Sequence, residues 1–307
     1  MTKILQGDSL EVLKKMESGP VDMCMTSPPY WGLRDYGDPG QLGLEPTFQE
    51  YIDKLVGIFD EVKRVLKDTG TCWVNLGDTY ASGGGKAVEQ SSKRQSAIDT
   101  GAYPDNCPGA KLRSTMGKSL IGIPERFVIA MTDAGWIRRN TIIWHKPNCM
   151  PSSASDRFTV DFEYLYFFSK SKKYWFDQQF DEANTSENVY RNKLRQHKKY
   201  NIAYDGYKNN FPIPRADGKR NKRCVWKINT KPYKGAHFAV YPEELIRTPI
   251  LAGCPKGGII LDPFMGSGTT LKVARDLDRK GIGIEINQEY IELAKKRIDI
   301  KQEMLKL

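Results

Sequence analysis

The stretch that decides the fold is residues 257–285, GGIILDPFMGSGTTLKVARDLDRKGIGIE. Its first apolar run predicts a buried strand that ends at Asp262, and Gly266 and Gly268 predict a tight turn after that strand. A helical pattern follows over Thr269–Leu277, and the end of the stretch returns as a second strand. Strand, helix and strand in this order predict one βαβ unit of a parallel sheet.

The turn and the acidic residue at the second strand's end are typical of a nucleoside site. Gly266 and Gly268 let the backbone approach a ligand closely, and Glu285 lies where a carboxylate can bond ribose hydroxyls. No Lys-Ser/Thr pair follows the glycines, and the turn does not match G-x-G-x-x-G. The unit therefore predicts a nucleoside cofactor that needs no phosphate contact, with a purely structural turn as the alternative.

Outward from this unit, strands and helices alternate along most of the chain. Strands are expected at residues 3–6, 21–25, 71–76, 136–145 and 162–169, and helices at 9–16, 48–66, 124–134 and 290–304. This pattern predicts an α/β fold with a doubly wound, largely parallel sheet. Residues 80–119 interrupt it with Ser, Gly and Pro and little apolar periodicity, so we expect a long mobile loop with a functional role.

Composition bounds the class of protein. The chain has 307 residues, of which 39% are hydrophobic and 27% charged, as in a folded soluble protein. No run approaches the roughly 18 apolar residues of a membrane span, and the N-terminus lacks a signal peptide's apolar run. The six cysteines include no C-x-x-C pair and do not cluster with the three histidines, which predicts free thiols and no metal site. We expect a cytoplasmic protein without a membrane partner.

The net charge of +10 is concentrated in one segment. Residues 186–234 contain fourteen Lys or Arg and three acidic residues, a local charge of +11, so the rest of the chain sums to −1. Phosphate neutralisation by Lys and Arg drives non-specific nucleic-acid binding, and a basic segment on a near-neutral body predicts a polyanion-binding module. A solvated basic surface is the alternative interpretation.

A second motif, Thr26-Ser-Pro-Pro-Tyr30, ends the strand at residues 21–25. Open α/β sheets bind their ligands at the carboxyl ends of strands. The two prolines fix the backbone, Ser27 and the Pro28 carbonyl supply hydrogen-bond acceptors, and Tyr30 supplies a flat stacking face. These groups suit a planar base with an exocyclic amine, whereas Trp31 fits a pocket wall and a core position equally well.

The two motifs together resemble the amino-methyltransferases of DNA. Asp262-Pro-Phe-Met-Gly-Ser-Gly268 is similar to their cofactor motif, and Ser27-Pro-Pro-Tyr30 is similar to their catalytic tetrapeptide. The tetrapeptide precedes the cofactor motif, as in the β-class permutation of the family, with the target-recognition region between them. The resemblance covers about residues 1–80, 120–175 and 235–300.

The resemblance implies a Rossmann-like methyltransferase domain at residues 1–175 and 235–307, with an inserted basic target-recognition region at 176–234. The implied cofactor is S-adenosylmethionine. The implied catalytic residues are Ser27, Pro28, Pro29 and Tyr30. The implied cofactor-binding residues are Asp8, Asp262, Pro263, Phe264, Gly266, Ser267, Gly268, Thr269 and Glu285.

The chemistry explains why such residues are needed. An exocyclic amino group is a poor nucleophile because its lone pair is delocalised into the ring. Hydrogen bonds from its N–H groups to Ser27 Oγ and the Pro28 carbonyl would favour a pyramidal nitrogen and direct in-line transfer. Methylation at cytosine C5 would need a nucleophilic Cys in a Pro-Cys pair, and no such pair occurs.

The target atom lies inside a stacked duplex, so the base must be flipped out, with Tyr30 as its stacking partner. The implied substrate is double-stranded DNA, and the basic segment is assigned to it. The predicted DNA-binding residues are Arg191, Arg195, Arg215, Arg220 and Arg223, most of them as phosphate clamps. A companion restriction endonuclease and a homodimer are the further partners compatible with the resemblance.

In this family Ser at the first tetrapeptide position is associated mainly with N4-cytosine methylation, and Asp with N6-adenine. Ser27 therefore favours cytosine N4, with adenine N6 as the alternative within the same chemistry. A non-catalytic nucleic-acid binder that retains the fold is the alternative from another class.

Overall fold

The computed structural model describes residues 2–32, 40–81, 116–182, 219–231 and 241–304. The chain divides into two compact units. The larger unit is residues 1–177 and 224–307, and the smaller unit is residues 178–223. Residues 224–231, which belong to the basic segment, are thus part of the larger unit.

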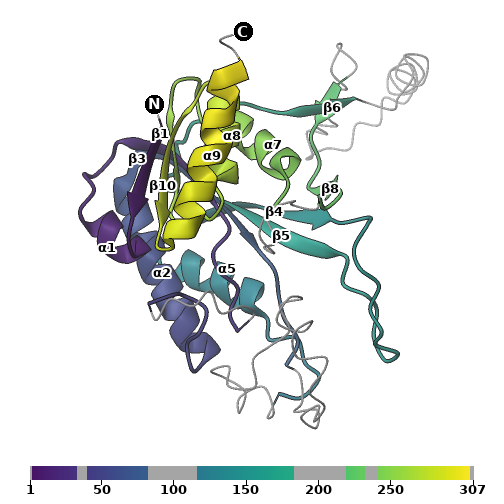
Figure 1. Ribbon diagram of the computed structural model, residues 1–307. Helices are drawn as coiled ribbons and strands as arrows, with labels where there is room; N and C mark the ends of the chain where they lie inside the picture. Colours follow the sequence, from purple (N-terminus) through teal and green to yellow (C-terminus); the bar gives the residue numbers. More distant parts are fainter. Residues whose placement is uncertain (1, 33–39, 82–115, 183–218, 232–240, 305–307) are drawn as a thin grey trace, which may run out of the picture. The chain divides into compact units, whose positions relative to one another are not determined.

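The larger unit is built on an eight-stranded sheet in the order β1-β10-β9-β2-β3-β5-β4-β8 (Figure 1). The strands are β1 (Thr2–Gln6), β2 (Val21–Thr26), β3 (Leu66–Leu76), β4 (Ile137–His145), β5 (Phe162–Ser169), β8 (Val225–Lys227), β9 (Ile259–Asp262) and β10 (Lys280–Glu285). All neighbouring pairs are parallel except those that β5 makes with β3 and β4. The predicted α/β fold with a largely parallel sheet is confirmed.

Six helices pack on this sheet within the described part of the larger unit. They are α1 (Ser9–Lys14), α2 (Phe48–Val65), α5 (Ile123–Asp133), α7 (Glu243–Gly253), α8 (Thr269–Asp276) and α9 (Gln288–Met304). Helix α2 contacts α1 and α5, whereas α8 contacts α7 and α9. The helix α2 begins where Thr47 accepts a hydrogen bond from the Glu50 amide, so a capping side chain satisfies one of the free donors of its first turn.

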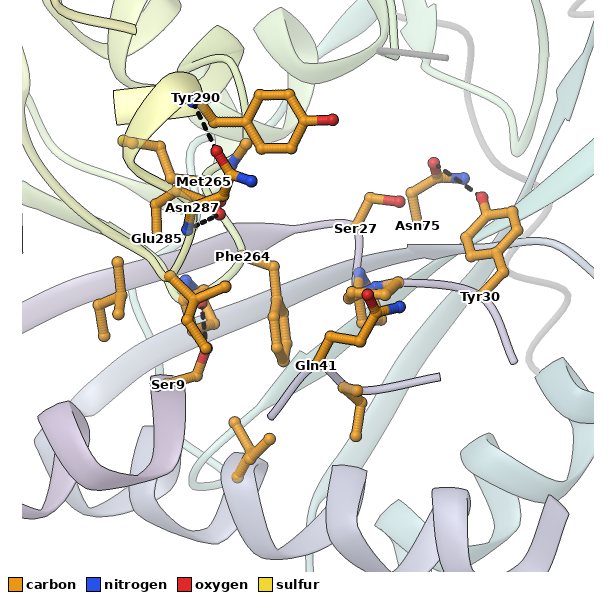
Figure 2. Close-up of a pocket in the computed structure, with 18 of the residues that line it drawn as sticks. Ser9, Ser27, Tyr30, Gln41, Asn75, Phe264, Met265, Glu285, Asn287 and Tyr290 are labelled. Carbon is orange, nitrogen blue, oxygen red and sulfur yellow. Dashed lines mark hydrogen bonds between the residues drawn. The ribbon is translucent and has the colours of Figure 1, made fainter. Parts of the chain in front are cut away.

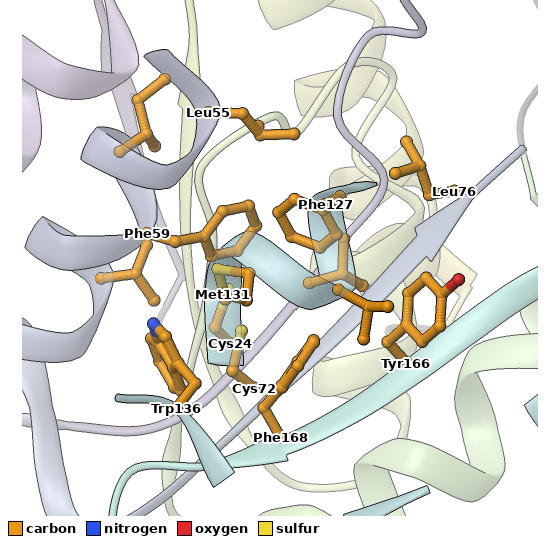
Figure 3. Close-up of a cluster of buried hydrophobic side chains, with 14 of the residues drawn as sticks. Cys24, Leu55, Phe59, Cys72, Leu76, Phe127, Met131, Trp136, Tyr166 and Phe168 are labelled. Atoms are coloured by element: carbon orange, nitrogen blue, oxygen red, sulfur yellow. The ribbon is translucent and has the colours of Figure 1, made fainter. Parts of the chain in front are cut away.

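The central strands are buried on both faces, as their alternating side chains show. On β2, Cys24 packs into the cluster that includes the buried side chains of α2 and α5, whereas Met25 packs into the cluster that includes those of α7. On β3, Cys72 and Trp73 divide in the same way. Figure 3 shows the first cluster, in which Phe59 of α2 contacts Phe127 of α5, and Phe127 in turn contacts Tyr166 and Phe168 of β5. Because successive residues of a strand point to opposite faces, a doubly covered sheet needs this near-continuous apolar sequence.

The helix α7 was not predicted. Its apolar residues follow helical spacing, but Pro242 precedes it and Pro249 lies inside it. Proline lacks the N–H donor and disfavours a helix interior, so the local signal opposes the helix. Burial of Leu245, Ile246 and Ile250 against β2 and β3 overrides that signal.

Two further differences concern the strands. β3 begins at Leu66, five residues before the strand expected at 71–76, and the pairing with β2 shifts register there. β5 is inverted because residues 146–161 join it to β4 without a helix, and such a connection makes neighbouring strands antiparallel.

The smaller unit contains the antiparallel pair β6 (Phe180–Glu182) and β7 (Lys219–Asn221). Lys222 Nζ bonds Asp181 Oδ1 at 2.9 Å beside this pair. Within the described ranges, no helix is long and apolar enough to cross a membrane. Five cysteines lie in those ranges, and each is a free thiol.

Candidate functional site

The topology brings the two motifs to one edge of the sheet. Seven strands run in the same direction, so their carboxyl ends share an edge, and the inverted β5 begins at that edge. β2 and β9 are neighbours, with Cys24 opposite Leu261, so Ser27 and Pro263 leave the sheet side by side. On the other side of β9, Gln6 of β1 lies opposite Glu285 of β10.

A cavity of about 1110 Å³ occupies this edge (Figure 2). Ligand pockets are usually about 300–1,000 Å³, so this one has room for a nucleoside cofactor and a base together. Eleven of the thirteen residues predicted for catalysis and cofactor binding line it, namely Asp8, Ser27, Pro28, Pro29, Tyr30, Pro263, Phe264, Gly266, Ser267, Thr269 and Glu285. Asp262 and Gly268 do not line it.

The tetrapeptide is held from its second proline onward. Tyr51 on α2 donates a hydrogen bond to the Pro29 carbonyl at 2.8 Å. Gly43 lies against the Tyr30 carbonyl, where an added Cβ would be 3.1 Å from the oxygen. Figure 2 shows Ser27 between Phe264 and Tyr30, with its hydroxyl turned toward the side of Asn75 and Tyr30.

Tyr30 is anchored through its hydroxyl. The Tyr30 hydroxyl donates to Glu163 Oε2 at 2.7 Å and lies 3.5 Å from Asn75 Oδ1. Burial raises the pKa of Tyr30 well above its ordinary value, and the negative charge of Glu163 adds to that shift. The phenol therefore stays protonated at neutral pH and serves as a donor.

The Gly-rich turn combines left-handed glycines with a clamp from α9. Gly266 and Gly268 have φ of +51° and +80°, and among the described residues, chain neighbours aside, none has an atom within 4 Å of an ideal Cβ at Gly266. Arg297 Nη1 donates to Ser267 Oγ at 2.8 Å and to Thr269 Oγ1 at 2.9 Å. The open side of Gly266 thus allows a ligand to approach the backbone, which fits a nucleoside cofactor.

Glu285 faces the same turn. Its two carboxylate oxygens accept from the Gly266 amide and the Asn287 amide, both at 2.9 Å. Burial raises the pKa of Glu285 against the lowering effect of these bonds. Because each carboxylate oxygen has a second lone pair, Glu285 can still accept from the two hydroxyls of a ribose.

Asp8 and Asp262 hold the backbone of the site. Asp8 caps α1, and its Oδ1 accepts from the Glu11 amide at 3.1 Å. Asp262 is only 1% exposed, and its Oδ1 accepts from Thr26 Oγ1 at 2.6 Å and from the Phe264 amide at 3.1 Å. Asp262 therefore ties the residue before Ser27 to the cofactor turn from beneath the cavity wall.

Sequence reasoning missed several polar residues of the cavity wall, among them Asn75, Lys146 and Glu163. Asn75 is the last but one residue of β3, within its buried run, and Glu163 is the second residue of β5, between Phe162 and Tyr164. A polar residue within an apolar strand was the available signal. Trp31 is core: it is 1% exposed and its indole N–H donates to the Glu45 carbonyl at 2.9 Å.

The predicted DNA contacts lie mostly outside the described residues. Arg191, Arg195 and Arg215 are not among them. Arg220 lies in β7 and Arg223 just after it, in the smaller unit. Most of the predicted loop at 80–119 also lies outside, but its ends are paired, since the Ala81 amide donates to the Ser119 carbonyl at 2.7 Å.

No group of residues within the described ranges has the composition and spacing of a metal site.

Comparison with known proteins identifies the family. The family described as DNA methylase, with N6 and N4 specificities, matches residues 21–296. The chain is 43% identical over 296 residues to the Type II methyltransferase M.SmaI of Serratia marcescens, covering 96% of this chain and 90% of that protein. It is 42% identical over 295 residues to M.Cfr9I of Citrobacter freundii, covering 96% and 87%.

Solved structures show the same fold. The PvuII DNA methyltransferase, cytosine-N4-specific, superposes with a TM-score of 0.62 at 21% identity, covering 96% of this chain and 87% of that one. A DNA modification methylase of Thermus thermophilus, in complex with S-adenosyl-L-methionine, superposes with a TM-score of 0.59 at 22% identity, covering 98% and 96%. The chain therefore belongs to the S-adenosylmethionine-dependent DNA methylases that modify an exocyclic amino group, N6 of adenine or N4 of cytosine.

Proposed function

We propose that this protein transfers a methyl group to N4 of a flipped-out cytosine in duplex DNA. The observation that carries the proposal is one cavity that Ser27–Tyr30 and the cofactor turn line together. Ser27 at the first tetrapeptide position favours cytosine. The cytosine-N4 specificity of the PvuII enzyme, which shares the fold, supports the same choice.

One side of the cavity would bind the cofactor, and the other side would bind the amino group of the base. On the β9 and β10 side, Glu285 and the open backbone at Gly266 would hold S-adenosylmethionine. When bound, this cofactor supplies an electrophilic methyl group on a sulfonium. On the β2 side, Ser27 Oγ and the Pro28 carbonyl would accept the two amino N–H groups, which localises the nitrogen lone pair for attack.

Tyr30 would stack on the flipped base, and the cavity walls would exclude water from it. Transfer of the methyl group would leave the amino nitrogen positively charged, and that nitrogen would then lose one proton to bulk water as the product leaves the cavity. No covalent enzyme intermediate forms in this sequence.

The basic segment would hold the duplex. Arg191, Arg195, Arg215, Arg220 and Arg223 are proposed to contact phosphates or base edges. Because the relatives M.SmaI and M.Cfr9I are Type II methyltransferases, we also propose a restriction–modification role with a companion endonuclease. We also propose that the protein forms a homodimer.

Base choice has a direct test. The purified protein is incubated with labelled S-adenosylmethionine and host DNA that lacks methylation, and the product is digested to nucleosides. We expect the label in N4-methylcytosine. Label in N6-methyladenine alone would reverse the base assignment, and no transfer to any duplex while the cofactor binds would refute the activity.

A further inference from the structure

The cavity wall beside Tyr30 contains an ion pair that neither motif includes. Lys146 Nζ lies 2.9 Å from Glu163 Oε1, and the two side chains are only 17% and 19% exposed. Lys146 also lies over the Trp144 ring, 5.3 Å from its centroid. Removing two charges from water costs free energy that their attraction often fails to recover, so such a pair at the edge of a cavity needs further contacts.

Glu163 has those contacts. Its Oε2 accepts from Tyr30 at 2.7 Å and from Asn75 Nδ2 at 3.1 Å. Asn75 is 1% exposed, and the same Nδ2 donates to the Tyr164 carbonyl at 3.0 Å. Three donors from three strand ends therefore hold the carboxylate in one place.

Two contacts together fix the Tyr30 ring. The hydroxyl lies on the axis of ring rotation, so its bond to Glu163 fixes the direction of that axis and leaves rotation about it free. Gly77 restricts the rotation, because an added Cβ there would be 2.7 Å from Tyr30 Cε2. The plane of the ring thus has one preferred orientation in the cavity wall.

We propose that Glu163, held by Lys146 and Asn75, is a positioning residue that orients the Tyr30 ring for stacking on the target base. This inference rests on the proposed function, in which a flipped base occupies the cavity. The Tyr30 ring contributes most to the free energy of base binding when it is already oriented before the base arrives. If the ring were ordered only during binding, its lost conformational entropy would reduce that free energy.

The test is a double-mutant cycle on the full chain. Tyr30→Phe removes only the hydroxyl and leaves the ion pair intact, and Glu163→Gln removes the charge at nearly constant volume. We expect each variant to lower the single-turnover rate of methyl transfer about tenfold, as for one hydrogen bond to a charged group, with unchanged affinity for S-adenosylmethionine. The double variant should be no slower than the slower single variant.

The chain offers a matched control. Tyr164 donates to Glu125 Oε1 at 3.1 Å, a second Tyr–Glu bond that does not line the cavity. Tyr164→Phe and Glu125→Gln should leave the transfer rate unchanged. Losses that multiply in the double variant, or an equal loss in Glu125→Gln, would overturn the proposal while leaving the proposed function intact.

A second measurement tests the contact without activity. In protein labelled with ζ-¹³C tyrosine, Glu163→Gln should shift the Tyr30 resonance, assigned from Tyr30→Phe, and leave that of Tyr164 in place. Glu125→Gln should do the reverse. An unmoved Tyr30 resonance in Glu163→Gln would overturn the proposal, whereas a wild-type protein that methylates no duplex would instead refute the proposed function.

Discussion

At the scale of single residues, Asp262 illustrates how a buried charge organises this site. Its Oδ2 accepts from Thr270 and, at 3.3 Å, from Tyr241, in addition to the two donors at Oδ1. Burial nevertheless raises the pKa of Asp262, because desolvation of the carboxylate outweighs these bonds. The folded protein therefore binds the Asp262 proton more tightly than the unfolded chain does.

This linkage has a definite sign. Below the ordinary aspartate pKa of 3.8 the group is protonated in both states, and its contribution to stability falls as pH rises through the higher folded pKa. We expect the free energy of unfolding of wild type, relative to Asp262→Asn, to decrease between about pH 4 and about pH 7. Urea denaturation at both pH values measures it. A difference that grows with pH would contradict the raised pKa.

Ser27 is the residue whose removal should separate chemistry from cofactor binding. Ser27→Ala deletes the acceptor for one amino N–H while the cofactor turn stays intact. We expect the turnover number to fall about tenfold or more, with a nearly unchanged dissociation constant for S-adenosylmethionine. Ser18→Ala, at an exposed serine outside the cavity, is the control. Equal loss of turnover and cofactor affinity would show that Ser27 is structural.

At the scale of elements, the site depends on close packing between α8 and α9. Gly268 caps α8 with φ of +80°, and an added Cβ would be 2.8 Å from Ala294 Cβ on α9. Arg297 on α9 also clamps the turn before α8. The second glycine of the motif thus serves helix packing, although the sequence placed it at the ligand.

Gly268→Ala tests that packing. We expect it to lower the free energy of unfolding by about 2–4 kcal/mol, from backbone strain plus overpacking. Gly257→Ala is the matched control, since Gly257 has φ of +78° but no described residue other than its chain neighbours lies within 4 Å of the added Cβ. Its cost should be the strain alone, about 1 kcal/mol. Equal losses in the free energy of unfolding for the two variants, measured by urea denaturation, would mean that α9 moves aside without loss of stability.

Elements with agreeing local signals were predicted from the sequence, and those with conflicting signals were not. α8 follows a Gly-rich turn and has regular apolar spacing, so its expected range of 269–277 matches the observed helix closely. Pro249 opposes α7 locally, and only packing on the sheet resolves the conflict. The inversion of β5 depends on which strands become neighbours, and periodicity does not report that.

At the scale of the whole molecule, charge is distributed unevenly along the chain. The segment 186–234 carries a local charge of +11, and the remainder is close to neutral. The smaller unit of residues 178–223 includes most of that segment. Residues 178–223 carry eleven Lys or Arg and five acidic residues, a net charge of +6, so the larger unit has a net charge of +4.

Salt dependence measures this division. If the basic segment binds DNA, the double variant Arg191→Gln with Arg195→Gln should bind with a weaker salt dependence. The slope of the logarithm of the DNA association constant against the logarithm of the salt concentration should become shallower by about 0.9 per lost phosphate contact. Lys14→Gln with Lys15→Gln removes the same charge from the end of α1, which runs back toward the opposite edge of the sheet. This control should leave the slope unchanged. An unchanged slope in the arginine variant would place the interface elsewhere.

The sequence by itself determined the α/β class, the two motifs and the location of the basic segment, because periodicity, glycine and proline act over a few residues. Only the tertiary structure decided that Asn75, Lys146 and Glu163 join Tyr30 in one cavity, that Trp31 is core, and that Asp262 lies beneath the wall. These contacts join residues far apart in the chain, such as Tyr30 with Glu163 and Thr26 with Asp262. They arise from strand order and register, which long-range burial of the sheet determines.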